Sequence, residues 1–217
     1  MKLKKIASLA LAGIMAVSML AGCSTTGNDD NLVPEVPAST TVVDYATDAL
    51  DNLDGKLTFA ESIWLDGKLG EIATNTSNFS ATDIKNSYDG NNAVYNYNMS
   101  VKVKNSLMEN GITYVNVGDF GTARNTVGSV SYAEVDVVSG KMDMKSAIES
   151  AVACLEANAT AARLVDTVNI NNVVYDCDYT CDISVLKVTN NTLSGETSWV
   201  VGFVINQNVT KSANSQV

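Results

Sequence analysis

Residues 173–188 read VVYDCDYTCDISVLKV, a run in which apolar or aromatic side chains mostly alternate with polar ones. A period of two indicates a β-strand that buries one face and leaves the other in water. The solvated face would carry Asp176, Asp178 and Asp182. Turn-forming residues follow at 190–195, and the apolar run at 198–206 is expected to return as the antiparallel partner. This long hairpin is the centre of the predicted sheet.

Four further strand regions precede this hairpin. Residues 167–170 are joined to it through an Asn-Asn turn, and residues 127–138 form another apolar run. Residues 93–103 alternate apolar and polar side chains, and the following Asn110-Gly111 is a type I′ hairpin signal that predicts a returning strand at 112–117. Strands with one wet face, joined by short turns, are typical of a mostly antiparallel sheet.

Helices are predicted where the apolar period changes to 3.6 residues. One apolar stripe runs through residues 40–53, and a longer one runs through residues 143–164. In addition, Ser80-Ala-Thr-Asp83 has the capping-box pattern and predicts a short helix to about Tyr88. The sequence therefore predicts an α+β fold, in which helices 40–53 and 143–164 pack on one face of a mostly antiparallel β-sheet.

The composition limits the classes of function. The chain has 217 residues, 46% of them hydrophobic, which suits one domain with a substantial core. Its 24 acidic and 14 basic side chains leave a net charge of −10, so we expect no nucleic-acid partner, because phosphates require clustered Lys and Arg. The chain has 0 histidines, which excludes Ser-His-Asp and Cys-His catalysis and His-ligated zinc.

The first residues have the parts of a secretory signal. A basic segment, Met1 to Lys5, precedes an apolar run from Ile6 to Met19, and Leu20-Ala21-Gly22-Cys23 follows. The apolar run is shorter than the roughly 20 residues of a membrane-spanning helix. Leu20-Ala21-Gly22-Cys23 resembles the lipobox of bacterial lipoproteins, in which the cysteine thiol receives a diacylglycerol and the peptide is cut just before it.

The resemblance implies that residues 1–22 are a lipoprotein signal peptide and that lipid on Cys23 holds the protein to the membrane. Residues 23–38 are polar, contain both prolines and are expected to form a flexible tether. A single α+β domain over 39–210 and a frayed tail at 211–217 would complete the chain. The protein would then be extracytoplasmic, anchored to the bacterial cell membrane, or to the outer membrane if the source has two membranes.

Asn52, Asp54 and Glu61 are weak candidates for calcium ligands. With Gly55 between them, they match the spacing of an EF-hand or dockerin-like calcium loop, whose oxygen ligands converge from a turn. The first ligand position would be Leu50, where the motif requires Asp. A plain Asp-Gly turn after the first helix is the alternative interpretation.

Three cysteines follow in the predicted domain. Cys177 and Cys181 lie on one face of the strand at 173–188, four residues and about 13 Å apart, which is too far for a disulfide. Cys154 lies on the flank of helix 143–164, which is expected to cover the same face. The sequence leaves two alternatives. Either Cys154 forms a disulfide with Cys177 or Cys181, or all three cysteines are free, buried thiols.

These observations favour a lipid-anchored, non-catalytic binding or interaction module with an unknown protein or glycan ligand and no cofactor. A structural or assembly protein of the cell envelope is the first alternative. A glycan-active enzyme that uses two carboxylates is the second, and it would need a cleft with two carboxyl groups about 5–10 Å apart beside Trp64 or Trp199.

Overall fold

The structure, a computed structural model, describes residues 39–74, 80–90, 94–95, 97–110, 119–120, 128–190 and 195–213. Cys23 and the predicted tether lie outside these ranges. The helices are α2 (Ser39–Asp48), α3 (Ile63–Thr74), α4 (Ala81–Asp89), α5 (Tyr97–Glu109) and α6 (Met144–Asn158). The strands are β1 (Thr58–Glu61), β2 (Val94–Tyr95), β3 (Gly128–Ser139), β4 (Thr167–Ile170), β5 (Val173–Thr189) and β6 (Thr197–Lys211). None of the described helices is long and apolar enough to cross a membrane.

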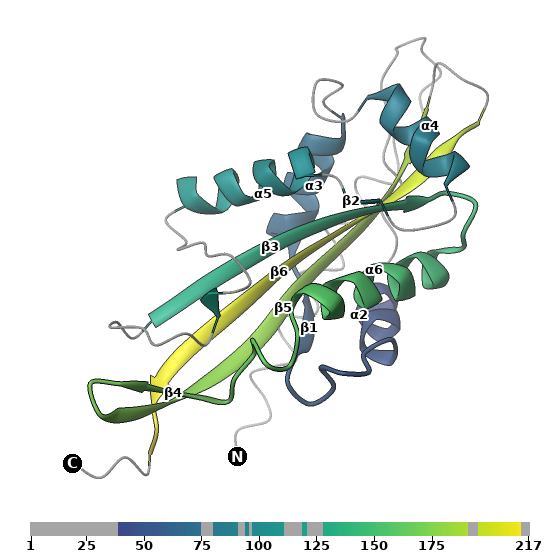
Figure 1. The fold of residues 1–217 in the computed structure, drawn as a ribbon. Helices are drawn as coiled ribbons and strands as arrows, with labels where there is room; N and C mark the ends of the chain where they lie inside the picture. Colours follow the sequence, from purple (N-terminus) through teal and green to yellow (C-terminus); the bar gives the residue numbers. More distant parts are fainter. Residues whose placement is uncertain are drawn as a thin grey trace, which may run out of the picture. The chain divides into compact units, whose positions relative to one another are not determined.

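The described strands form one sheet in the order β1-β5-β6-β3-β2 (Figure 1). The long strands β5 and β6 pair antiparallel along almost their whole length, and β3 pairs antiparallel with the other edge of β6. Both β4 and β1 pair with the free edge of β5, and β1 is parallel to it. The predicted α+β fold with a mostly antiparallel sheet is confirmed.

The predicted turn between β4 and β5 is also confirmed. Asn171 and Asn172 have φ angles of 54° and 65°. Two consecutive residues with positive φ are what a type I′ hairpin requires, and asparagine tolerates this conformation better than most residues.

Helices α2 and α6 cover one face of the sheet, as the sequence predicts. Their apolar stripes join β5 and β6 in one core, in which Ala46, Ile148 and Leu155 are fully buried. Both helices are shorter than predicted. Helix α6 ends at Asn158 because Ala159 leaves the helical conformation, and a turn at 160–164 brings Leu164 into the core instead.

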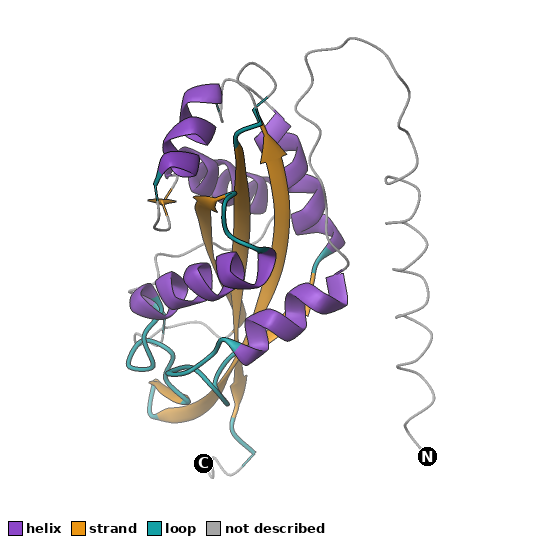
Figure 2. Ribbon diagram, turned by 90° about the vertical axis from the view of Figure 1, so that its right-hand side faces the viewer, coloured by secondary structure: helices purple, strands orange, loops and turns teal. Residues whose placement is uncertain are grey.

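The other face of the sheet is covered by a second group of helices, α3, α4 and α5, so that the long strands run between two helical layers (Figure 2). Leu65, Leu69 and Ile84 are fully buried there against β3, β5 and β6. Within this group, α4 begins at the predicted capping box: Asp83 N–H donates to Ser80 Oγ, and Ser80 N–H donates to the Asp83 carboxylate.

The predicted strand at 93–103 is wrong. Only Val94 and Tyr95 pair with β3, and the chain from Tyr97 to Glu109 is helix α5. Val103 of α5 is fully buried in the core that α3, α4 and α5 form with the sheet. Alternation over a few residues fits a helical face as well, since Met99, Val103 and Leu107 are spaced by four. The predicted returning strand at 112–117 lies outside the described residues.

Candidate functional site

Strand β3 places two carboxylates inside the protein. It is buried on both faces, because α6 lies against one and α4 and α5 lie against the other. Ala133, Val135 and Val137 point toward the core on the α4 and α5 side. The intervening Glu134 and Asp136 therefore point toward α6, since successive side chains alternate between the faces of a strand. Both acidic residues are 0% exposed.

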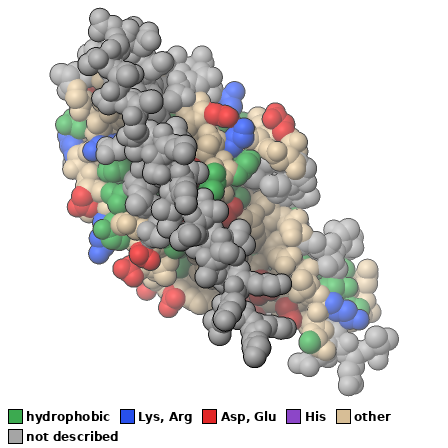
Figure 3. Space-filling view, turned by 180° about the vertical axis from the view of Figure 1, so that it is seen from behind, with side chains coloured by type: hydrophobic (Ala, Val, Ile, Leu, Met, Phe, Trp, Pro, Cys, Tyr) green, Lys and Arg blue, Asp and Glu red, His purple; other side chains and the backbone are tan. Residues whose placement is uncertain are grey.

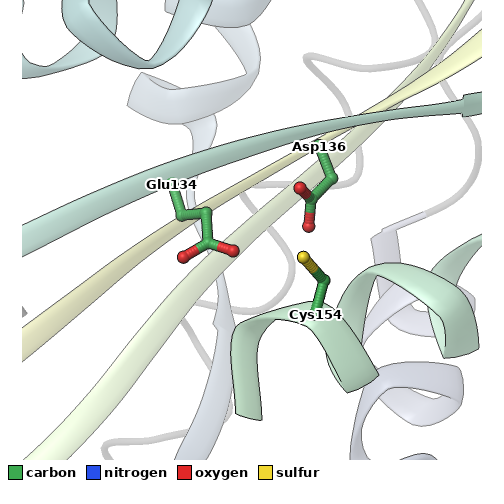
Figure 4. Close-up of side chains that lie close together, drawn as sticks. All are labelled: Glu134, Asp136 and Cys154. Carbon is green, nitrogen blue, oxygen red and sulfur yellow. The ribbon is translucent and has the colours of Figure 1, made fainter. Parts of the chain in front are cut away.

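Helix α6 supplies the third member of this cluster. Its N-terminus is capped by Asp143, and Ala151, Val152 and Leu155 form the stripe that enters the core. Cys154 lies next to that stripe and points toward β3, so its sulfur faces the carboxylates of Glu134 and Asp136 (Figure 4). The ligand atoms of the three residues all lie within 4.8 Å of one another.

The two carboxylates differ in their hydrogen bonds. Glu134 accepts one from the Tyr132 hydroxyl at 2.5 Å and one from Asn158 Nδ2 at 3.0 Å. Asp136 contacts the Cys154 thiol, and neither of its oxygens accepts a hydrogen bond from the other described residues. A buried carboxylate without donors is costly, because the hydrogen bonds that it made to water have not been replaced.

Burial raises the pKa of Asp136 to about 8; the negative charge of Glu134 adds to the shift, and contact with the Cys154 thiol opposes it. Burial also raises the pKa of Glu134, against the hydrogen bonds from Tyr132 and Asn158. The pKa of Cys154 rises to about 12 through burial and the charges of Asp136 and Glu134. Asp136 and Cys154 therefore keep their protons to a higher pH than exposed Asp and Cys side chains do.

The environment limits what the cluster can do. Glu134 and Asp136 are closed to a substrate such as a glycan, because neither has exposed surface. Cys154 is partly exposed, so solvent contacts α6 at this residue. Lys104 of α5 interacts electrostatically with Glu134. The cluster can exchange protons or hold an ion, and it cannot admit a large ligand.

The structure places the calcium candidates on the surface. Asn52 and Asp54 are exposed in the turn after α2, and Glu61 is exposed at the end of β1. In the same turn, the backbone N–H groups of Asp51 and Leu53 donate to Glu156 of α6. A calcium loop directs oxygen atoms at the ion, whereas this turn directs two backbone N–H groups at a carboxylate. The calcium site at Asn52, Asp54 and Glu61 stays an untested prediction.

Asp176 and Asp178 are exposed and Asp182 is partly buried, which confirms the predicted solvated face of β5. An open groove of about 490 Å³ lies along this edge, between the start of β4 and the start of β1. It is lined by Asp176, Asp178 and the ion pair of Lys56 with Asp166, whose charged atoms are 2.6 Å apart. On the face drawn in Figure 3, the basic side chains that the structure describes are few and lie among acidic and neutral ones.

The cysteines of the domain are free thiols in the structure. Cys177 and Cys181 are buried on the α6 face of β5, as predicted, whereas Cys154 is directed toward β3. The structure therefore agrees with the interpretation of three free thiols, except that Cys154 is partly exposed and only Cys177 and Cys181 are buried.

Glu134 and Asp136 were not predicted from the sequence as site residues. The signal was present: residues 130–138 read VSYAEVDVV, and two acids at alternate positions of an apolar strand share a face. That this face is covered by α6 could not be read from the strand alone. No protein-family model, curated protein or solved structure matches the chain.

Proposed function

We propose that this protein is an extracytoplasmic lipoprotein, held to the membrane by lipid on Cys23, whose domain from Ser39 onward is a non-catalytic binding module. The observation that carries the proposal is the run Leu20-Ala21-Gly22-Cys23 directly after a basic and then an apolar segment. Residues 23–38 would separate the domain from the membrane surface, which an acidic protein does not bind by charge.

The described domain supports binding better than glycan hydrolysis. The close carboxylate pair, Glu134 and Asp136, is fully buried. Trp199 is 8% exposed, and its Nε1–H donates to the backbone carbonyl of Met142. Trp64 packs against the α3 side of the core. The groove beside β4 and β1 is the place where a polar ligand fits, with both signs of charge on its walls.

The proposal is tested by replacing Cys23 with Ser in the full chain. The variant is expected in the soluble fraction or as an uncut precursor, because anchoring depends on that one thiol, and it should not incorporate labelled palmitate. The neighbouring Ser24→Ala change is the control and should leave anchoring intact. A Cys23→Ser protein that is still processed and fully membrane-bound would overturn the proposal.

A further inference from the structure

The unpartnered carboxylate of Asp136 points to a ligand within the cluster of Glu134, Asp136 and Cys154. Asp136 is 0% exposed, and its carboxylate contacts the thiol of Cys154, itself a member of the cluster, while its oxygens accept no hydrogen bond from the other described residues. Glu134, in contrast, is held by Tyr132 and Asn158. The cluster thus combines one oriented carboxylate, one carboxylate with free lone pairs and one thiol.

The donor atoms select the kind of ligand. Two carboxylates facing each other attract a cation, and a sulfur donor favours a metal that accepts thiolate. Calcium and magnesium prefer sets made only of oxygen, whereas zinc binds thiolate and carboxylate together in tetrahedral sites. Tetrahedral zinc with these donors needs ligand atoms about 3.4–3.6 Å apart. Here the three atoms lie within 4.8 Å of one another, so small rotations of the side chains suffice.

A divalent cation also relieves the electrostatic cost of the cluster. In the metal-free protein the two carboxyl groups lie close together in a buried place, which is costly for their charges. A bound metal is held by carboxylates and a thiolate, so binding releases to solvent the protons that these ligands carry. The bound form has two carboxylates, one thiolate and one M²⁺, a net charge of −1.

We propose that Glu134, Asp136 and Cys154 bind one thiophilic divalent cation of the zinc class, with water as the fourth ligand. The cation would enter past the partly exposed Cys154, and Tyr132 and Asn158 would hold Glu134 in place. This inference goes beyond the proposed function and does not depend on the lipid anchor.

The test uses the full chain with Cys23→Ser, purified in detergent, so that Cys154, Cys177 and Cys181 are its thiols and lipidation plays no part. Zinc is titrated in competition with a chromophoric chelator, and Co²⁺ serves as the spectroscopic probe. We expect one metal per chain, a thiolate-to-cobalt charge-transfer band in the near ultraviolet, release of protons on binding and binding of Ca²⁺ at least 100-fold weaker than that of Zn²⁺.

Matched variants locate the site. Cys154→Ser should abolish the charge-transfer band and weaken zinc binding at least tenfold, whereas Cys177→Ser should retain both. Asp136→Asn should weaken zinc binding to a similar degree while the metal-free protein unfolds at a higher temperature than its parent, which excludes misfolding as the cause. The proposal is overturned by stoichiometric cobalt binding without the band, by equal affinity for Ca²⁺ and Zn²⁺, or by unchanged zinc binding in both variants. It is likewise overturned if no metal binds, and the cluster is then a carboxyl pair that shares a proton.

Discussion

Glu156 of α6 accepts the backbone N–H of Leu53 at 2.9 Å through its Oε1 atom, joining the helix to the turn that follows α2. The same oxygen accepts the N–H of Asp51 at 3.0 Å. Glu156 is only 8% exposed, and Leu53 is fully buried next to it. One carboxylate therefore accepts hydrogen bonds from two backbone N–H groups in the turn that follows α2, where they have no partner within the helix.

Replacing Glu156 by Ala should lower the free energy of unfolding by about 2–4 kcal/mol, since two backbone N–H groups lose a charged acceptor at a buried position. Glu156→Gln keeps an oxygen acceptor and should cost about half as much. Urea unfolding followed by circular dichroism measures both changes. Glu149→Ala, on the exposed side of the same helix, is the control. An equally small effect at positions 149 and 156 would mean that the hydrogen bonds to the turn contribute little.

Gly202 lies where α3 approaches the centre of β6. A Cβ atom at this position would lie 2.5 Å from Leu69 Cδ1, and Leu69 is fully buried. Gly202→Ala should therefore destabilise the protein by about 1–3 kcal/mol through overpacking. Combined with Leu69→Ala, which alone should cost about 2–5 kcal/mol, it should cost less than the sum, because the new methyl group occupies part of the cavity.

Gly67→Ala is the matched control for Gly202→Ala. Gly67 is an exposed residue inside α3, with nothing within 4 Å of the position of a Cβ. Alanine there should stabilise the protein by about 0.5–1 kcal/mol, because it restricts the unfolded chain and favours helix. Unfolding curves of the parent, Gly202→Ala, Leu69→Ala and the double variant give the coupling free energy between positions 69 and 202. Strict additivity would contradict the close packing of α3 on β6.

The elements predicted correctly are those that local chemistry specifies. The alternation at 173–188, the Asn171-Asn172 turn and the Ser80 capping box each involve neighbouring residues. Helix α5 was missed because a short alternating run fits two conformations, and packing of Val103 against the α3 side of the core is long-range. The cluster at Glu134, Asp136 and Cys154 was missed because it also depends on a long-range contact: its members come from a strand and a helix that meet only in the folded chain.

The stability of the metal-free protein should depend on pH through Asp136. Its pKa is about 8 in the folded state against an ordinary value of 3.8, so between these values the folded protein holds a proton that the unfolded chain has released. The free energy of unfolding should then fall as the pH rises from 4 to 8, by up to about 1.4 kcal/mol per pH unit from this group. Glu134, whose pKa is also raised, contributes with the same sign.

Asp136→Asn isolates this contribution, because Glu134 and Cys154 still face the position. The variant should match the parent near pH 4 and become progressively more stable than the parent toward pH 8. Unfolding by urea at each pH, with a chelator present, gives the difference between the two proteins. If that difference does not change with pH, Asp136 is ionised in the folded state throughout and its raised pKa is wrong.

Asn158→Ala tests whether the residues around the cluster orient its ligands. Asn158 Nδ2 donates to Glu134 Oε1 at 3.0 Å, and it contacts neither Asp136 nor Cys154 through an observed hydrogen bond. Loss of a hydrogen bond that orients a metal ligand weakens binding about 10–100-fold in known sites. We expect a loss at the lower end for Zn²⁺, because Tyr132 still holds the other oxygen of Glu134. The thiolate-to-cobalt band should persist, since Cys154 is untouched.

Asn86→Ala, at an exposed position of α4, is the control and should bind zinc like the parent. If Asn158→Ala removed the band as well, the residue would act on the fold of α6 as a whole, and its proposed part in orienting Glu134 would be wrong.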